Sequence, residues 1–210
     1  MRNSTFSLNQ FATLFLVGVL AVVAVPANAD NKRAPDFVGV TMTGDHIRLS
    51  DFRGKAVVLE WTNHQCPYVR KHYSSGNMQK TQRALTEDGA VWISIISSAP
   101  GKQGYVAAEE AQKLTAARGS YAGYVILDSD GSIGRQYGAK TTPHMFVIDE
   151  NGHLIYQGAI DDIPSASRRT LKDATNLVLA AWTDFQAGEP IARPITKPYG
   201  CTVKYSDTID

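Results

Sequence analysis

The spacing of apolar positions changes along the chain between patterns that predict strands and patterns that predict helices. Residues 56–62 (AVVLEWT) and 91–97 (VWISIIS) are β-branched and mostly apolar, which is typical of strands buried on both faces of a sheet. Residues 67–87 are polar enough for a half-exposed helix, and 107–118 are rich in strong helix formers. The expected core contacts of the helix over 67–87 are Val69, Tyr73, Met78 and Leu85.

The second half of the chain contains the clearest local pattern. In residues 144–160 two apolar runs flank Glu-Asn-Gly, which predicts a β-hairpin. Residues 167–188 predict one long amphipathic helix that ends at Gly188. Its apolar positions at helical spacing are Leu171, Ala174, Leu177, Val178, Ala181 and Trp182. Strands that alternate with helices, followed by a hairpin, predict an α/β fold with a mixed sheet and helices on both faces.

The amino-terminal residues predict a signal peptide rather than part of the fold. Residues 11–25 are almost wholly apolar, and Ala27 and Ala29 have the spacing of a signal-peptidase site. We expect cleavage after Ala29, so that the protein is periplasmic or secreted and has no stable membrane association afterwards. The alternative is a retained anchor, although the apolar run is short for a membrane span. Residues 30–189 then form one domain, and 190–210 form a Pro-rich tail.

Charge and cysteine content narrow the possible functions. The chain has 21 basic and 20 acidic side chains, a balance that gives no reason to expect nucleic acid or an anionic membrane as a partner. Its two cysteines are Cys66 and Cys201. An exported protein of this size does not depend on a disulfide to fold, so the cysteines are available for redox chemistry.

Cys66 lies where thiol chemistry is favoured. It follows the strand 56–62 in WTNHQCPYVRKHY, and Pro67 suits the first turn of a helix. A helix N-terminus lowers the pKa of a thiol, and the thiolate is the nucleophile. We expect further positive charge from His64, Arg70, Lys71 and His72. The sequence thus predicts a reactive, solvent-open sulfur, with an inert structural cysteine as the alternative.

Three segments carry a resemblance to a known family. They are residues 34–63, the CPYV of residues 66–69, and residues 137–162 (YGAKTTPHMFVIDENGHLIYQGAIDD). Together they resemble the redoxin branch of the thioredoxin fold, the alkyl hydroperoxide reductase and thiol-specific antioxidant family. The resemblance implies a three-layer sandwich in which Cys66 is redox-active.

The resemblance also implies roles for residues around Cys66. The loop at Thr142-Pro143 is expected to hold a cis-proline that faces the sulfur and lets a substrate strand or thiol approach. Glu60, six residues before Cys66, corresponds to a buried acid that moves protons in thioredoxins. Asn63 and Thr62 are candidates for hydrogen bonds to the thiolate or to a bound peroxide.

Two departures from the family distinguish this chain. Val69 stands where a Cys-x-x-Cys pair has its second cysteine. Typical peroxiredoxins have Thr three residues before the cysteine, where this chain has Asn63, with Thr62 one position earlier. The absence of the peroxiredoxin Thr at its expected spacing favours disulfide exchange over peroxide reduction.

The missing partner thiol is predicted in the tail. If the tail folds back across the sheet edge, Cys201 can resolve an intermediate on Cys66 through an intramolecular disulfide. A static disulfide, a lone thiol and an intermolecular pair remain open alternatives.

The predicted function is therefore an exported thiol-disulfide oxidoreductase that needs no organic cofactor or metal and takes electrons from a dithiol protein. The alternatives are a thiol-dependent peroxidase and a copper-binding or copper-delivery module that uses Cys66 with His64 or His144.

Overall fold

The computed structural model describes Met1 and residues 32–207, so the predicted signal peptide and its cleavage site lie outside the described residues. A five-stranded sheet has the order β5-β4-β3-β7-β8. Its strands are β3 (Val57–Trp61), β4 (Val91–Ile96), β5 (Tyr124–Leu127), β7 (His144–Ile148) and β8 (Leu154–Gly158). β3, β4 and β5 run parallel, and β7 and β8 form the predicted antiparallel hairpin. The expected mixed α/β sheet is confirmed.

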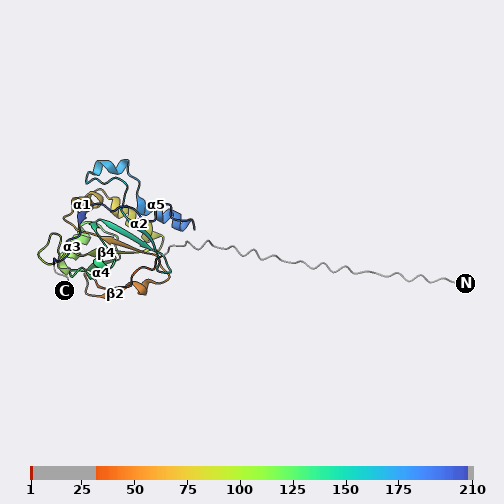
Figure 1. Cartoon of the computed structure of the whole chain (residues 1–210), viewed down its shortest axis with the longest axis horizontal. Helices are drawn as coiled ribbons and strands as arrows, with labels where there is room; N and C mark the ends of the chain where they lie inside the picture. The colour runs from red at the N-terminus through yellow and green to blue at the C-terminus, as the bar shows by residue number, and fades with distance from the viewer. Residues whose placement is uncertain (2–31, 208–210) are drawn as a thin grey trace.

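Successive side chains of β3 point to opposite faces of the sheet, so the core has two layers. Val58 faces a layer built on α1 (Pro67–Ser74), α2 (Asn77–Glu87) and α5 (Leu177–Gln186). Val57 and Leu59 face the opposite layer, to which α4 (Ser132–Gln136) and a hairpin of β1 (Val38–Val40) and β2 (His46–Arg48) contribute. The remaining helices are η1 (Leu49–Phe52) and α3 (Ala108–Ala117), which packs near β5. In Figure 1, α1, α2 and α5 lie above β4, and α4 and β2 lie below it.

The helix predicted over 67–87 is two helices. α1 ends at Ser74 and α2 begins at Asn77, because Gly76 adopts a left-handed conformation with φ 76°. Glycine takes this conformation without the steric cost that a side chain brings. The predicted core contacts were right: Val69, Tyr73, Met78 and Leu85 are all buried.

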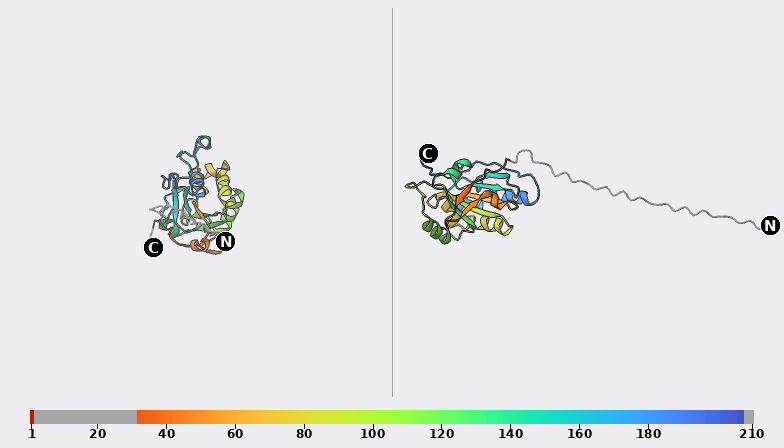
Figure 2. Two further views of the ribbon diagram at one scale, coloured as in Figure 1. Left: turned by 90° about the vertical axis from the view of Figure 1, so that its right-hand side faces the viewer. Right: turned by 90° about the horizontal axis from the view of Figure 1, so that it is seen from below.

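The helix predicted over 167–188 is also interrupted. A short 3-10 helix, η2 (Arg168–Lys172), precedes α5, which begins only after Asn176. The Asn176 side chain accepts a hydrogen bond from the Leu179 N–H and caps α5. Leu171 and Ala174 therefore lie outside α5. The segment around η2 stands clear of the sheet in Figure 1 and in the left view of Figure 2.

The carboxy-terminal tail follows the edge of the sheet. The Gln157 N–H donates to the Pro194 carbonyl at 2.9 Å, and the Thr196 N–H donates to the Gln157 carbonyl at 3.0 Å. Further on, β9 (Cys201–Thr202) pairs antiparallel with β6 (Thr141–Thr142). The tail thus crosses from β8 to the segment that precedes β7, which brings Cys201 to the end of β3 where Cys66 lies.

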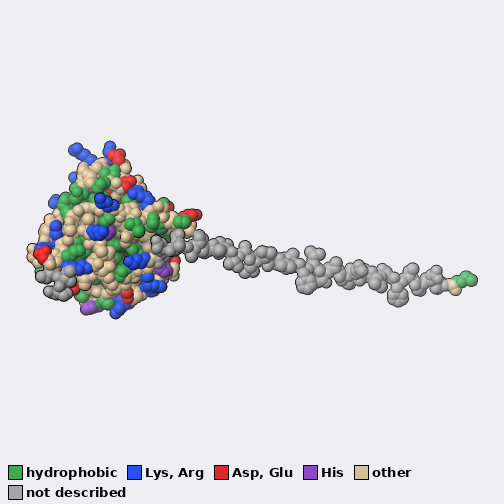
Figure 3. Space-filling view, viewed as in Figure 1, with side chains coloured by type: hydrophobic (Ala, Val, Ile, Leu, Met, Phe, Trp, Pro, Cys, Tyr) green, Lys and Arg blue, Asp and Glu red, His purple; other side chains and the backbone are tan. Residues whose placement is uncertain are grey.

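On the face of the molecule drawn in Figure 3 the charged side chains do not form one large patch. Lys and Arg side chains are spread over the face in Figure 3 rather than gathered into one patch. Across residues 32–207 no helix has the length and apolar character required to cross a bilayer.

Candidate functional site

Cys66 is placed by the junction between β3 and α1. Its N–H donates to the Asn63 carbonyl at 3.0 Å, which closes the loop after β3, and its carbonyl accepts from the Arg70 N–H at 2.9 Å. Cys66 is therefore the N-cap of α1, and Pro67 occupies the first turn as predicted. The sulfur lies at the end of the helix where backbone N–H groups favour negative charge.

Two segments from distant parts of the sequence meet the Cys66 sulfur. The thiol donates to the Thr142 carbonyl at 3.0 Å, and the Thr142–Pro143 peptide is cis, as the resemblance implies. Thr142 is paired with Cys201 in the register of β6 and β9. The two cysteines lie close enough for each thiol to shift the pKa of the other, and neither is in a disulfide. The structure thus brings together Cys66, Cys201 and the cis-proline loop.

The two thiols differ in acidity, and each shifts the pKa of the other. Burial alone would raise the pKa of Cys66, but hydrogen bonds to its sulfur, first from Cys201 and then from the Val69 N–H, lower the pKa below its ordinary value. The pKa of Cys201 is raised to about 12 by burial and by the hydrogen bond to Cys66. Cys66 is therefore the more acidic thiol of the pair and Cys201 the less acidic one.

The expectation that Cys66 is open to solvent is wrong. Its side chain is 0 % exposed, whereas Cys201 is only partly buried. The cause is the tail, whose backbone packs against the cis-proline loop. At Gly200, with φ 141°, an added Cβ would lie 2.1 Å from the Thr142 carbonyl oxygen. Only glycine permits this approach, so Gly200 allows the tail to cover the site.

The expected ring of positive charge around Cys66 is also largely absent. Burial lowers the pKa of His72 to about 4, so its imidazole is neutral at pH 7. Burial and the nearby Arg118 lower the pKa of His64. Lys71 is buried and paired with Asp161 at 2.8 Å. Arg70 alone remains an exposed cation among the four residues, so hydrogen bonds and the helix end, rather than neighbouring charges, favour the thiolate.

A buried polar cluster anchors the tail beside the cysteines. The Tyr199 hydroxyl donates to Asp161, whose carboxylate also accepts from Lys71. The side chains of Lys71 and Asp161 are 0 % and 2 % exposed, and the Tyr199 ring lies against Tyr68. Burial, together with Asp161, raises the pKa of Tyr199, so it remains a donor. Sequence reasoning missed this cluster, because no local pattern pairs Lys71, Asp161 and Tyr199.

The other predicted neighbours of the thiolate have structural partners. Asn63 accepts from the Gln65 N–H at 2.8 Å and donates to the Gln103 carbonyl at 3.2 Å, so its amide shapes the loop. The Thr62 hydroxyl is buried without a hydrogen-bond partner in the described part of the chain. His64 lies on the wall of a neighbouring pocket.

Glu60 is buried in the core, as the resemblance implies, and is held by a dense set of donors. Its carboxylate accepts from the Tyr73 hydroxyl at 2.9 Å, Trp92 Nε1 at 3.0 Å, Ser94 Oγ at 2.9 Å and Gln82 Nε2 at 3.2 Å. None of these partners is a cysteine. A role for Glu60 in proton transfer remains a prediction.

The residues of the copper alternative are not assembled into a ligand set. His144 is buried, its Nδ1 accepts from the Lys140 N–H at 3.3 Å, and its ring packs on Phe146. Burial lowers the pKa of His144 to about 4. Within residues 32–207 no group of three or more His, Cys, Asp or Glu side chains is arranged to hold a metal ion.

Comparison with known families agrees with the site. The model of the family described as Redoxin matches residues 29–178, a span that includes Cys66, Thr142 and Pro143. The chain belongs to the Redoxin family. It is a thiol-dependent oxidoreductase by this membership, and the predicted resemblance is confirmed.

Several solved structures of other proteins are similar to this chain. A hypothetical protein from Sinorhizobium meliloti is 22 % identical with a TM-score of 0.68, and the match covers 85 % of this chain and 95 % of that one. A conserved protein from Geobacillus kaustophilus is 21 % identical with a TM-score of 0.70, covering 85 % and 93 %. The thioredoxin domain of a Bacteroides vulgatus thiol-disulfide oxidoreductase is 20 % identical with a TM-score of 0.49, covering 70 % and 98 %. No curated protein matches the chain.

Replacement of Gly200 tests whether the tail buries Cys66 in this redoxin. Gly200→Ala places a methyl group against the Thr142 carbonyl and adds a backbone cost of about 1–2 kcal/mol, so the tail should open more often. We expect alkylation of Cys66 by iodoacetamide, followed by mass spectrometry, to be roughly tenfold faster or more.

Gly44→Ala is the matched control. Gly44 also has a positive φ, 90°, but its added Cβ meets nothing within 4 Å. Equal alkylation rates in wild type, Gly200→Ala and Gly44→Ala would contradict the account of the tail as a cover.

Proposed function

We propose that the protein is an exported thiol-disulfide oxidoreductase in which Cys66 is the nucleophile and Cys201 the resolving cysteine. The observation that carries the proposal is the proximity of the two thiols, which come from the start of α1 and from the tail and which shift each other's pKa. In this proposal Cys201 of the tail and Cys66 at the start of α1 take the places of the two cysteines of a Cys-x-x-Cys site. The lowered pKa of Cys66 and the raised pKa of Cys201 support this division of roles.

The first step needs the tail to move aside, because Cys66 is covered in the closed form. The Cys66 thiolate then attacks one sulfur of a substrate disulfide. A new sulfur–sulfur bond joins Cys66 to the substrate, the substrate disulfide breaks, and its other sulfur leaves as a thiolate that takes a proton.

The second step uses the return of the tail. Cys201 loses its proton to the departing substrate sulfur or to water and attacks the Cys66 sulfur of the mixed disulfide. The Cys66–Cys201 disulfide forms and the second substrate thiol is released. Pairing of β9 with β6 supports this step, because it returns Cys201 to the side of Cys66. The substrate has gained two electrons, and a dithiol protein that reduces the Cys66–Cys201 disulfide completes the cycle.

The hydrogen bonds of the Asn63 amide favour disulfide exchange over peroxide reduction. This residue stands three positions before Cys66, where a peroxidase would need a donor to the peroxide, and both ends of its amide are engaged by the loop. If a peroxide is the oxidant, Cys66 becomes a sulfenic acid with release of an alcohol or water. Cys201 then condenses with the sulfenic acid to the same disulfide and releases water.

Export is part of the proposal and rests on the apolar run over 11–25 and the Ala27 and Ala29 spacing. An oxidising compartment outside the cytoplasm suits a protein whose catalytic cycle passes through a disulfide.

Trapping of the intermediate tests the two roles. In Cys201→Ser, treated with bis(hydroxyethyl) disulfide, we expect a stable mixed disulfide on Cys66, because the resolving thiol is absent. In wild type we expect the intramolecular disulfide and no lasting adduct, and Cys66→Ser should react at least about a hundredfold more slowly. Mass spectrometry of the intact and digested protein measures all three.

A lasting adduct in wild type at the level of Cys201→Ser would contradict the resolving role. Peroxide replaces the disulfide in a parallel arm. A dimedone adduct that forms on Cys66 faster than the mixed disulfide does would make the protein a peroxidase instead.

Loss of the Tyr199 hydroxyl tests whether the buried cluster positions the tail. Tyr199→Phe removes a hydrogen bond to a charged group, worth about 1.5–3 kcal/mol, and leaves Asp161 paired with Lys71. Cys201 should then have a lower effective concentration at Cys66. Equilibration with glutathione should show the Cys66–Cys201 disulfide roughly tenfold easier to reduce, about 30 mV less negative in potential.

Tyr137→Phe is the control for this measurement. The Tyr137 hydroxyl donates to the Pro35 carbonyl at 2.7 Å, so Tyr137→Phe removes a buried hydroxyl without breaking a hydrogen bond to the described part of the tail. Identical equilibria for wild type, Tyr199→Phe and Tyr137→Phe would contradict a positioning role for Tyr199.

A further inference from the structure

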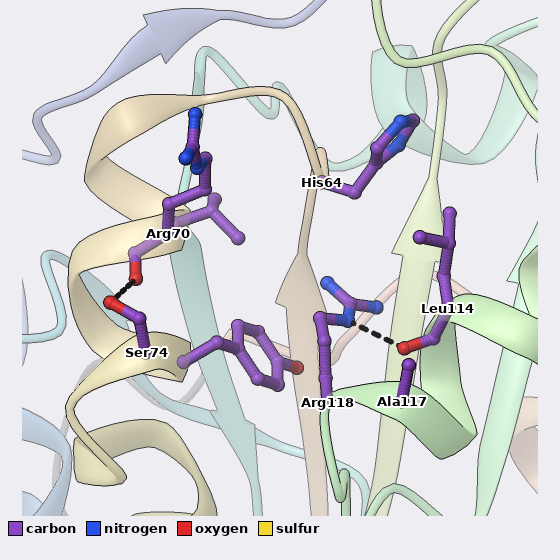
Figure 4. Close-up of a pocket in the computed structure, with 8 residues that line it drawn as sticks. His64, Arg70, Ser74, Leu114, Ala117 and Arg118 are labelled. Carbon is purple, nitrogen blue, oxygen red and sulfur yellow. Dashed lines mark hydrogen bonds between the residues drawn. The ribbon is translucent and has the colours of Figure 1, made fainter.

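A pocket of about 350 Å³ lies between α1 and the end of α3, next to the loop that carries Cys66. In Figure 4, α1 with Arg70 and Ser74 forms one wall, and the end of α3 with Leu114 and Arg118 faces it. His64 lies at the upper end. The volume is that of a site for a small organic molecule.

Two arginines line this pocket without an acidic partner. Arg118 Nε donates to the Leu114 carbonyl at 3.3 Å, but its Nη1 is buried and has no hydrogen-bond partner among the residues described. The Arg70 guanidinium is exposed and takes part in no ion pair in this part of the chain. A buried donor that lacks a partner is costly, and a rotation of the Arg118 guanidinium toward an anion in the pocket would give this donor an acceptor.

The other residues that line the pocket limit which chemical groups of an anionic ligand fit beside its negative charge. Val69, Leu114 and Ala117 present apolar surface, and the Tyr73 ring lies under Arg118 at 4.3 Å. No Asp or Glu belongs to the lining. His64 has a lowered pKa, to which the charge of Arg118 contributes after burial, so it is a neutral polar group at pH 7. The pocket therefore matches a short apolar body that ends in an anion.

We propose that this pocket binds a small aliphatic carboxylate, with the carboxylate on Arg118 and Arg70 and the hydrocarbon part against Val69 and Leu114. The planar guanidinium fork fits a carboxylate with paired hydrogen bonds. The site adjoins the redox centre through Val69, which lines the pocket and whose N–H helps to lower the pKa of Cys66. Binding in the pocket requires no reaction of either thiol.

Calorimetric titration of the reduced full chain with hexanoate tests the proposal. We expect saturable binding of hexanoate and at least about tenfold weaker binding of hexanol, which has the same hydrocarbon body without the charge. Arg118→Gln and Arg70→Gln should each weaken hexanoate binding by roughly tenfold. Arg83→Gln removes an arginine that packs on Tyr121, outside the pocket, and should bind hexanoate like wild type.

Three results would overturn the proposal. They are the absence of saturable hexanoate binding in wild type, equal affinities for hexanoate and hexanol, and unchanged affinity in both Arg118→Gln and Arg70→Gln. Arg118 also packs on Tyr73, so circular dichroism checks that Arg118→Gln is folded. If it is not, the exposed Arg70 decides the question, and unchanged hexanoate affinity in Arg70→Gln then rejects the site. Cys66→Ser should bind hexanoate like wild type, which separates this site from the thiol chemistry.

Discussion

The pairing of β9 with β6, which places Cys201 beside Cys66, is the constraint on which the rest of the site depends. It joins two residues of the tail to the two residues before the cis-proline, and Gly200 lets the backbones approach. The same contact sets the acidity of both thiols and buries the nucleophile. A thioredoxin-like site builds its thiol pair within one turn of a helix, whereas this chain builds it from two segments that only the folded sheet brings together.

In this arrangement the reactivity of Cys66 depends on movement of the tail. In the proposed mechanism the tail covers Cys66 in the closed form, so a large substrate reaches the sulfur only in the fraction of molecules whose tail is displaced. The buried cluster of Lys71, Asp161 and Tyr199 makes displacement costly, because the charged groups are shielded from water. The strength of this anchor therefore sets both the rate of access and the tendency of the disulfide to form.

Much of the architecture was readable from the sequence. The buried strand before Cys66, the helix start at Pro67 and the hairpin over 144–160 follow from periodicity and turn residues, which act locally. Two helix breaks were missed. Gly76 follows two serines, and Asn176 ends a short polar stretch, and both signals were weaker than the apolar spacing around them.

The parts of the site that the sequence did not predict depend on contacts between distant residues. Burial of Cys66 follows from the path of the tail. Lys71 contacts Asp161 across 90 positions and Tyr199 across 128, so neither contact leaves a local pattern. Neither Lys71 nor His72 supplies the free positive charge expected near Cys66, because neighbours from other segments pair the lysine and desolvate the imidazole.

The most direct test of the central claim is an NMR titration that follows the Cβ chemical shift of each cysteine in the reduced protein. The account predicts that Cys66 ionises below the value of about 8.5 for a free cysteine, while Cys201 stays protonated to well above it. A Cys66 that ionises at or above the free value, or a Cys201 that ionises first, would contradict the assignment of nucleophile and resolving thiol.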